Sequence, residues 1–146
     1  MITLDAIDQQ LISILRSNAR TPVVELAKKL GVSRATVQNR MKRLESNDVI
    51  VNYTVNLKPA AEINPIRALM SIAVEGKKAR SVITTLRGYP EIVALHNTNG
   101  RWDIIAEIRT ESLESFNRLL GEVRLIDGVS STETSLLLDS LDLSGS

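Results

Sequence analysis

The sequence contains no cysteine, few aromatic residues and no long apolar run. Without cysteine, disulfides and thiolate metal sites are excluded. Because aromatics make up only 3% of the chain, its core has to be built from Leu, Ile, Val and Ala. A membrane helix needs roughly 20 consecutive apolar residues, and the opening MITLDAIDQQ lacks the basic head and apolar stretch of a signal peptide. We therefore expect a folded cytoplasmic protein that needs no membrane, metal or cofactor.

Neither sign of charge predominates over the 146 residues, whose formal net charge is +1, but the two ends of the chain differ. Residues 1–58 carry nine Lys or Arg and five Asp or Glu, whereas residues 59–146 carry nine and twelve. The stretch GVSRATVQNRMKRLE, residues 31–45, has four basic residues and reaches its first acid only at its end. This asymmetry indicates an anionic partner for the N-terminal part.

Three short helices are predicted before residue 47. Apolar residues at helical spacing define the first, with Asp5 as its N-cap. The second begins at Thr21-Pro22, with Thr21 as its N-cap, and Gly31 ends it. A glycine turn that leads into a polar and basic helix is typical of a helix-turn-helix.

The third helix, capped by Ser33, is the candidate DNA-reading element. One side carries the apolar stripe Val37, Met41 and Leu44, and the other carries small residues, amides and cations. Amides can pair with base edges and cations with phosphates. We expect four cations to hold phosphates or to pack at the helix edge: Arg34, Arg40, Lys42 and Arg43. The predicted DNA-binding residues are Ser33, Arg34, Ala35, Thr36, Gln38, Asn39, Lys42 and Arg43.

A strand is predicted over Val49–Leu57, VIVNYTVNL, because this stretch is rich in β-branched residues. It would serve as a wing or a linker strand and complete a first domain of residues 1–60. A winged helix can also bind RNA or protein, so the fold alone leaves the ligand open.

The second predicted domain, residues 61–146, has the order βαββαβ of a ferredoxin-like fold. The expected strands are 67–74, 92–98, 102–109 and 129–138, and the expected helices are 79–87 and 112–123. The expected inward residues are Ala79, Val82, Ile83 and Leu86 on the first helix and Leu113, Phe116, Leu120 and Val123 on the second. The fold class is therefore α+β, a winged helix-turn-helix followed by a ferredoxin-like domain.

The strands of this domain offer apolar residues to both faces of the sheet. In the first strand, Ala68, Met70 and Ile72 alternate with Leu69 and Ala73. Because both helices of the fold cover one face, the other face needs a partner, and we expect at least a dimer.

The stretch HNTNGRWDII, residues 96–105, is the most distinctive part of the domain. Asn99-Gly100 predicts a tight hairpin turn in which both residues have positive φ. One interpretation is a simple turn with Trp102 packed on a neighbouring strand. In the other, the Asp103 carboxylate binds an ammonium group, and Arg101 or backbone N–H groups bind a carboxylate.

Taken in order, these stretches resemble the leucine-responsive regulator/asparagine regulator (Lrp/AsnC) family of transcription factors. LDAIDQQLISILRSNART is similar to the family's opening helix, and VVELAKKLGVSRATVQNRMKRLESNDVI to its helix-turn-helix. NGRWDII resembles its Thr-Gly-x-Tyr-Asp hairpin, with Trp102 in place of Tyr, and VSSTETSLLL resembles its last strand.

The resemblance implies a DNA-binding regulator that dimerises through the ferredoxin-like domain, assembles in many cases into octamers and binds an amino acid between dimers. The effector-binding residues that it implies are Asn99, Gly100, Arg101, Trp102, Asp103, Thr134, Ser135 and Leu136. Trp102 is bulkier than the usual Tyr and Arg101 adds a cation, so the effector's identity stays open.

Two other functions compete with an effector-gated regulator. An enzyme is poorly supported, because the single histidine, His96, lies in a predicted strand, where we expect it to be packed or to face a dimer partner. An architectural DNA-binding protein without effector shares every N-terminal feature, and only a ligand test separates it from the regulator.

Overall fold

The structure, a computed structural model, describes residues 2–141, and the chain divides into two compact units between Asn56 and Leu57. The predicted domain limit, between residues 60 and 61, lies four residues further on, and residues 142–146 of the predicted second domain lie outside the described part. Each unit has its own apolar core. Within residues 2–141, every helix is too short or too polar to span a membrane.

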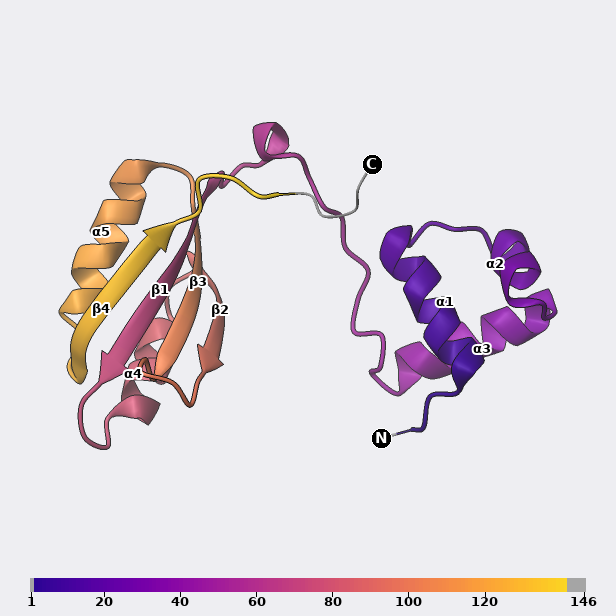
Figure 1. The fold of residues 1–146 in the computed structure, drawn as a ribbon, viewed down its shortest axis with the longest axis horizontal. Coiled ribbons are helices and arrows are strands. Elements are labelled where there is room, and N and C mark those ends of the chain that lie inside the picture. Colours follow the sequence, from indigo (N-terminus) through magenta and orange to yellow (C-terminus); the bar gives the residue numbers. More distant parts are fainter. Residues whose placement is uncertain (1, 142–146) are drawn as a thin grey trace. The chain divides into compact units, whose positions relative to one another are not determined.

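The first unit consists of α1 (Ala6–Ser17), α2 (Val23–Leu30) and α3 (Arg34–Ser46) (Figure 1). The caps Asp5 and Ser33 are confirmed, because each side chain accepts a backbone N–H of the first turn, at 2.8 and 3.1 Å. Gly31 ends α2 with φ of 67°, the left-handed conformation predicted for it. The buried core is Leu11, Leu15, Leu26, Ala27, Leu30, Val37 and Leu44.

Two local predictions for this part of the chain are wrong. Pro22, not Thr21, is the N-cap of α2, and the Thr21 hydroxyl instead donates to the Asn18 carbonyl at 2.7 Å. Val49–Leu57 is not a strand, because a strand requires a hydrogen-bonded neighbouring strand and, among the described residues, no strand pairs with this segment. Val51 and Val55 are accordingly exposed.

The second unit is a four-stranded antiparallel sheet in the order β2-β3-β1-β4, as in a ferredoxin-like fold. After a short 3-10 helix, Pro59–Ala61, the elements are β1 (Ile66–Val74), α4 (Ala79–Leu86), β2 (Ile92–Asn97), β3 (Ile104–Thr110), α5 (Leu113–Arg124) and β4 (Val129–Leu136). Figure 1 shows α4 and α5 against the sheet, and both contribute to the single core beneath its helix-covered face. The predicted βαββαβ order is confirmed.

Side chains of the sheet alternate between the two faces as the strand period requires. Ile104, Ala106 and Ile108 share one face and are buried under the helices. On α5 the buried stripe is Phe116, Leu119 and Val123, a complete i, i+3, i+7 pattern. Leu113, predicted to point inward, is therefore exposed, and so is Ala79 on α4.

The other face of the sheet, called here the open face, is more polar than predicted. The register places Leu69 between Glu107 and Ser135, and Ser71 between Ile105 and Glu133. The charged residues of β3 and β4 thus lie beside the residues of β1 on this face. An apolar stripe nevertheless persists, since Leu69 and Leu137 are more than a third exposed.

Candidate DNA interface and effector site

The predicted DNA-reading face of α3 lies at the surface of the first unit. Val37 and Leu44 are fully buried and turn the opposite side of the helix outward. Of the eight predicted DNA-binding residues, six are exposed, namely Ser33, Arg34, Ala35, Gln38, Asn39 and Lys42. Thr36 and Arg43 are half-buried. The exposed set offers amide, hydroxyl and cationic groups on one side of one helix, as contact with a duplex requires.

One flank of α3 is tied to α1 by an ionic cluster, called here the Asp8 network, of Asp5, Asp8, Arg40 and Arg43. Asp8 is fully buried, and its two carboxylate oxygens lie 2.9 Å from Arg40 Nη1 and 3.3 Å from Arg43 Nη1. Arg40 Nη1 also lies 2.7 Å from both carboxylate oxygens of Asp5. The hydrogen bond from Arg40 holds the pKa of Asp5 below its usual value, and the two carboxylates raise the pKa of Arg40.

Arg43 has a second intramolecular contact, because its Nη2 donates to the carbonyl of Thr3 at 2.9 Å. Four cations were expected to hold phosphates or to pack at the helix edge. Arg40 and Arg43 pack at the edge, against Asp5 and Asp8, whereas Arg34 and Lys42 are exposed. The phosphate role of Arg43 stays a prediction.

The loop between β2 and β3 holds five of the predicted effector residues, but it is not the tight turn expected. Neither Asn99 nor Gly100 has positive φ. Instead the Thr98 hydroxyl accepts the Gly100 N–H at 3.2 Å and donates to the Trp102 carbonyl, which closes a wider loop. The Arg101 guanidinium lies over the Trp102 ring, 5.4 Å from its centroid, as a cation–π pair.

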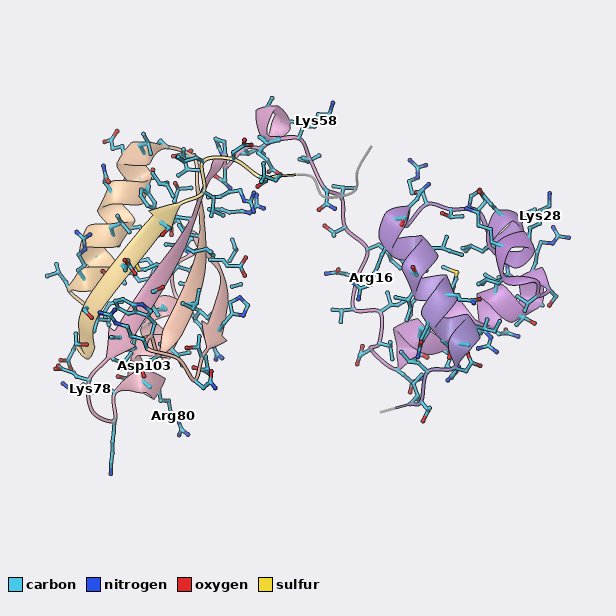
Figure 2. The ribbon with its side chains drawn as sticks, viewed as in Figure 1. Arg16, Lys28, Lys58, Lys78, Arg80 and Asp103 are labelled. Atoms are coloured by element: carbon cyan, nitrogen blue, oxygen red, sulfur yellow. The ribbon has the colours of Figure 1, made fainter. Side chains whose placement is uncertain are left out.

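Asp103 already has a contact within the fold. Its Oδ2 accepts the N–H of Val74 at 2.8 Å, at the point where the β1–β4 register shifts. Figure 2 shows Asp103 at the end of the sheet where Lys78 and Arg80 begin α4. The carboxylate therefore supports the strand end and lies in a region that also carries cations.

The second group of predicted effector residues, on β4, lies far from this loop. Leu136 pairs with Ala68, whereas Asp103 contacts Val74, six residues further along β1. At roughly 3.3 Å per residue, the separation is about 20 Å. Ser135 is on the open face, and Thr134 is on the helix-covered face, where its buried hydroxyl has no partner in the described structure. One chain does not bring the two groups together.

Comparison with known proteins identifies both units. An AsnC-type helix-turn-helix domain matches residues 4–45, and an Lrp/AsnC ligand binding domain matches residues 67–145. The chain belongs to the Lrp/AsnC family. The HTH-type transcriptional regulator FL11 of Pyrococcus furiosus is 36% identical over 92% of this chain and 89% of its own length. FL11 of Pyrococcus horikoshii is 32% identical over 94% of this chain and 91% of its own length.

Solved structures of Lrp/AsnC proteins share the fold. AsnC of Escherichia coli has a TM-score of 0.83 and 25% identity, covering 95% of each chain. A transcriptional regulator of Neisseria meningitidis, solved in complex with L-Met, has a TM-score of 0.83 and 23% identity over 96% of this chain and 93% of that one. The chain is thus a DNA-binding transcriptional regulator with a domain for a small-molecule ligand, and it is not an enzyme.

Sequence reasoning missed Asp8 and Glu91. Asp8 could have been noticed, because an acid three residues before the inward Leu11 falls on the buried side of α1. Nothing in the sequence singles out Glu91, whose Oε2 is buried without a hydrogen-bond partner in the described structure. It borders a hollow of about 200 Å³ that contains none of the predicted effector residues and is lined by Asn64, Pro90, Glu91, Arg109, Thr110, Glu111 and Ser115.

The single histidine is on the open face. His96 Nε2 lies 2.7 Å from Glu107 Oε2, and both side chains are about half exposed. The prediction that His96 is packed within the chain is therefore wrong. That it faces a dimer partner stays a prediction.

Proposed function

We propose that this Lrp/AsnC protein recognises a specific, roughly palindromic operator with the outward face of α3. The observation that carries this proposal is the group of exposed amide, small and cationic residues opposite the buried Val37 and Leu44. Two copies related by a two-fold axis would place their α3 helices in major grooves one or more helical turns apart. Because such a protein acts on chromosomal DNA, we also propose a cytoplasmic location.

The test begins with selection of binding sites from a random duplex pool by the full-length chain, followed by fluorescence anisotropy with the selected duplex. Asn39→Ala and Lys42→Ala are expected to weaken binding without changing assembly, Asn39→Ala by about 1–3 kcal/mol if it loses a bidentate base contact. Arg124→Ala, an exposed cation of α5, is the matched control and should bind normally. Unchanged affinity in both α3 variants would refute the proposed face, and preference for an RNA duplex would refute the proposed ligand.

We propose that the effector is an amino acid or a similar zwitterion bound beside the Thr98–Asp103 loop. The loop combines a carboxylate on Asp103 with a guanidinium on Arg101, the two charges that a zwitterion needs. Because Thr134–Leu136 pair with β1 four to six residues from Val74, about 13–20 Å away at the usual rise per residue, we propose that they complete the site from a second chain. The hollow beside Glu91 contains none of these residues.

A thermal stability screen of the common amino acids tests the effector. A ligand that binds only the folded protein adds about 2.7 kcal/mol at 100 times its Kd. L-methionine, which is bound in the Neisseria structure, is the natural first ligand. If neither the common amino acids nor their close analogues raise the melting temperature, the architectural alternative without effector is favoured.

We propose that the chain forms at least a dimer through the open face, and that dimers assemble further into a ring as large as an octamer. The exposed apolar stripe that includes Leu69 and Leu137 supports this pairing. Leu69→Glu is expected to dissociate the dimer in multi-angle light scattering, because it places a second carboxylate beside Glu107. A protein that is monomeric before any substitution would refute the proposal.

A further inference from the structure

We propose that Asp8 is a positioning residue for DNA recognition. Its buried carboxylate holds Arg40 and Arg43 and thereby fixes the rotation of α3. In this proposal the two arginines support the helix from within the unit and do not contact phosphate, which replaces the phosphate role predicted for Arg43 from the sequence. This inference rests on the proposed function, the reading of DNA by α3. It assigns a role to the one charged side chain among residues 2–141 that is fully buried.

The placement of the two arginines on α3 supports this role. At roughly 100° per residue, Arg40 and Arg43 lie about 60° and 120° from Val37, on the same flank of the helix. Their side chains are 23% and 40% exposed, and the donors identified above point at α1 and at the residues that lead into it. That flank is therefore covered by α1, whereas Arg34 and Lys42 lie outside it and are exposed.

The Asp8 network can fix the rotation of α3 because its ion pairs are directional. The aliphatic stripe of Val37, Met41 and Leu44 buries α3 but sets its rotation only loosely, since apolar contacts have no preferred angle. Charge-assisted hydrogen bonds from planar guanidinium groups do have one. A buried carboxylate that loses its partners is strongly unfavourable, so the ion pairs hold one arrangement of the two helices.

A substitution that removes the charge of Asp8 distinguishes a positioning role from a purely electrostatic effect on DNA affinity. Asp8→Asn takes one negative charge from the DNA-binding unit, so electrostatics alone would tighten DNA binding. Positioning predicts the reverse, a loss of roughly tenfold or more, the size of one lost base contact. Asp48→Asn is the matched control: it also removes one carboxylate, at a residue whose φ of 56° suits Asn, outside the Asp8 network. It should bind at least as tightly as wild type.

Salt dependence provides the second readout, with the full-length protein and the duplex that the wild type selects. Lys42→Gln should lower the slope of log K against log salt by about 0.9, the value of one phosphate contact. Arg43→Gln should weaken binding but leave that slope unchanged. If Asp8→Asn fails to fold by circular dichroism, the Arg43→Gln slope decides alone.

The inference is overturned if folded Asp8→Asn binds as tightly as Asp48→Asn, or if Arg43→Gln lowers the slope as Lys42→Gln does. A wild-type chain that selects no duplex would instead overturn the proposed function itself. The two failures are therefore distinguishable.

Discussion

All eight predicted DNA-binding residues lie on α3 or at its N-cap, whereas the eight predicted effector residues lie on two separate segments of the sheet unit. A single helix of 13 residues and its N-cap thus carry the whole proposed DNA interface within one chain. The predicted effector residues lie toward opposite ends of the sheet, and we propose that a second chain brings them together. The two proposed sites therefore differ in what they require: DNA reading should depend on the local order of one unit, and effector binding on the assembly of chains.

The two units also differ in how they fix their functional residues. In the sheet unit, strand pairing and an aliphatic core under α4 and α5 set the position of each residue. In the helical unit, a small aliphatic core is supplemented by the Asp8 network between α1 and α3. Substitutions in one unit should therefore affect one function and spare the other.

The largest expected effect on stability comes from truncating a buried core side chain. Leu11→Ala removes a fully buried side chain of α1, and such truncations cost about 2–5 kcal/mol. We expect the helical unit to lose DNA binding in anisotropy while the sheet unit keeps any ligand-induced rise in melting temperature. Ile104→Ala in the sheet core should give the converse, and Val24→Ala, at an exposed apolar site, is the control. Loss of both functions in Leu11→Ala would show that the units are not independent.

The next effect separates two roles of Asp103. Asp103→Ala removes both the charge and the acceptor of the Val74 N–H, whereas Asp103→Asn keeps an acceptor. We expect both variants to lose the effector response, Asp103→Ala to lose about 1 kcal/mol of stability as well, and DNA binding to persist in both. Thermal melts with and without the effector measure this. A full response in Asp103→Asn would mean that the carboxylate does not bind the ligand.

Sequence patterns predicted the parts of the molecule that depend on neighbouring residues. The caps Asp5 and Ser33, the turn at Gly31 and the βαββαβ order follow from short-range chemistry and periodicity, and the structure confirms them. The prediction at Val49–Leu57 was wrong because β-branched composition does not supply a pairing partner.

For the candidate sites too, the sequence predicts features within one element but not contacts between distant ones. The outward face of α3 could be derived from a helical wheel, because one helix carries it. The link from Asp8 to Arg40 could not, because 32 residues separate them. The separation of Asp103 from Leu136 depends on strand register, which the sequence did not specify.

A smaller loss of folding stability is expected on acidification, through Asp5. Arg40 lowers the pKa of Asp5 in the folded state, so the folded protein binds this proton less readily than the unfolded chain does. The stabilisation is present above the ordinary Asp pKa and is lost as the pH falls through it and below. Melting curves of wild type and Asp5→Asn between pH 5 and pH 2 should therefore converge on acidification. Curves that stay parallel would show that the ion pair with Arg40 contributes nothing to folding.

The smallest expected effect concerns Tyr53, which links the segment after α3 back to that helix. Its hydroxyl donates to Glu45 Oε1 at 2.8 Å, and burial, reinforced by Glu45, raises the pKa of Tyr53 to about 12. The folded state therefore keeps this proton after the unfolded state has lost it, so the stabilisation is present below pH 10 and declines between about 10 and 12. Tyr53→Phe should cost about 0.5–1 kcal/mol at neutral pH, since the pair is partly exposed, and should destabilise less between pH 10 and 12. An equal alkaline loss in both proteins, measured by urea unfolding, would show that this hydrogen bond does not order the segment beside α3.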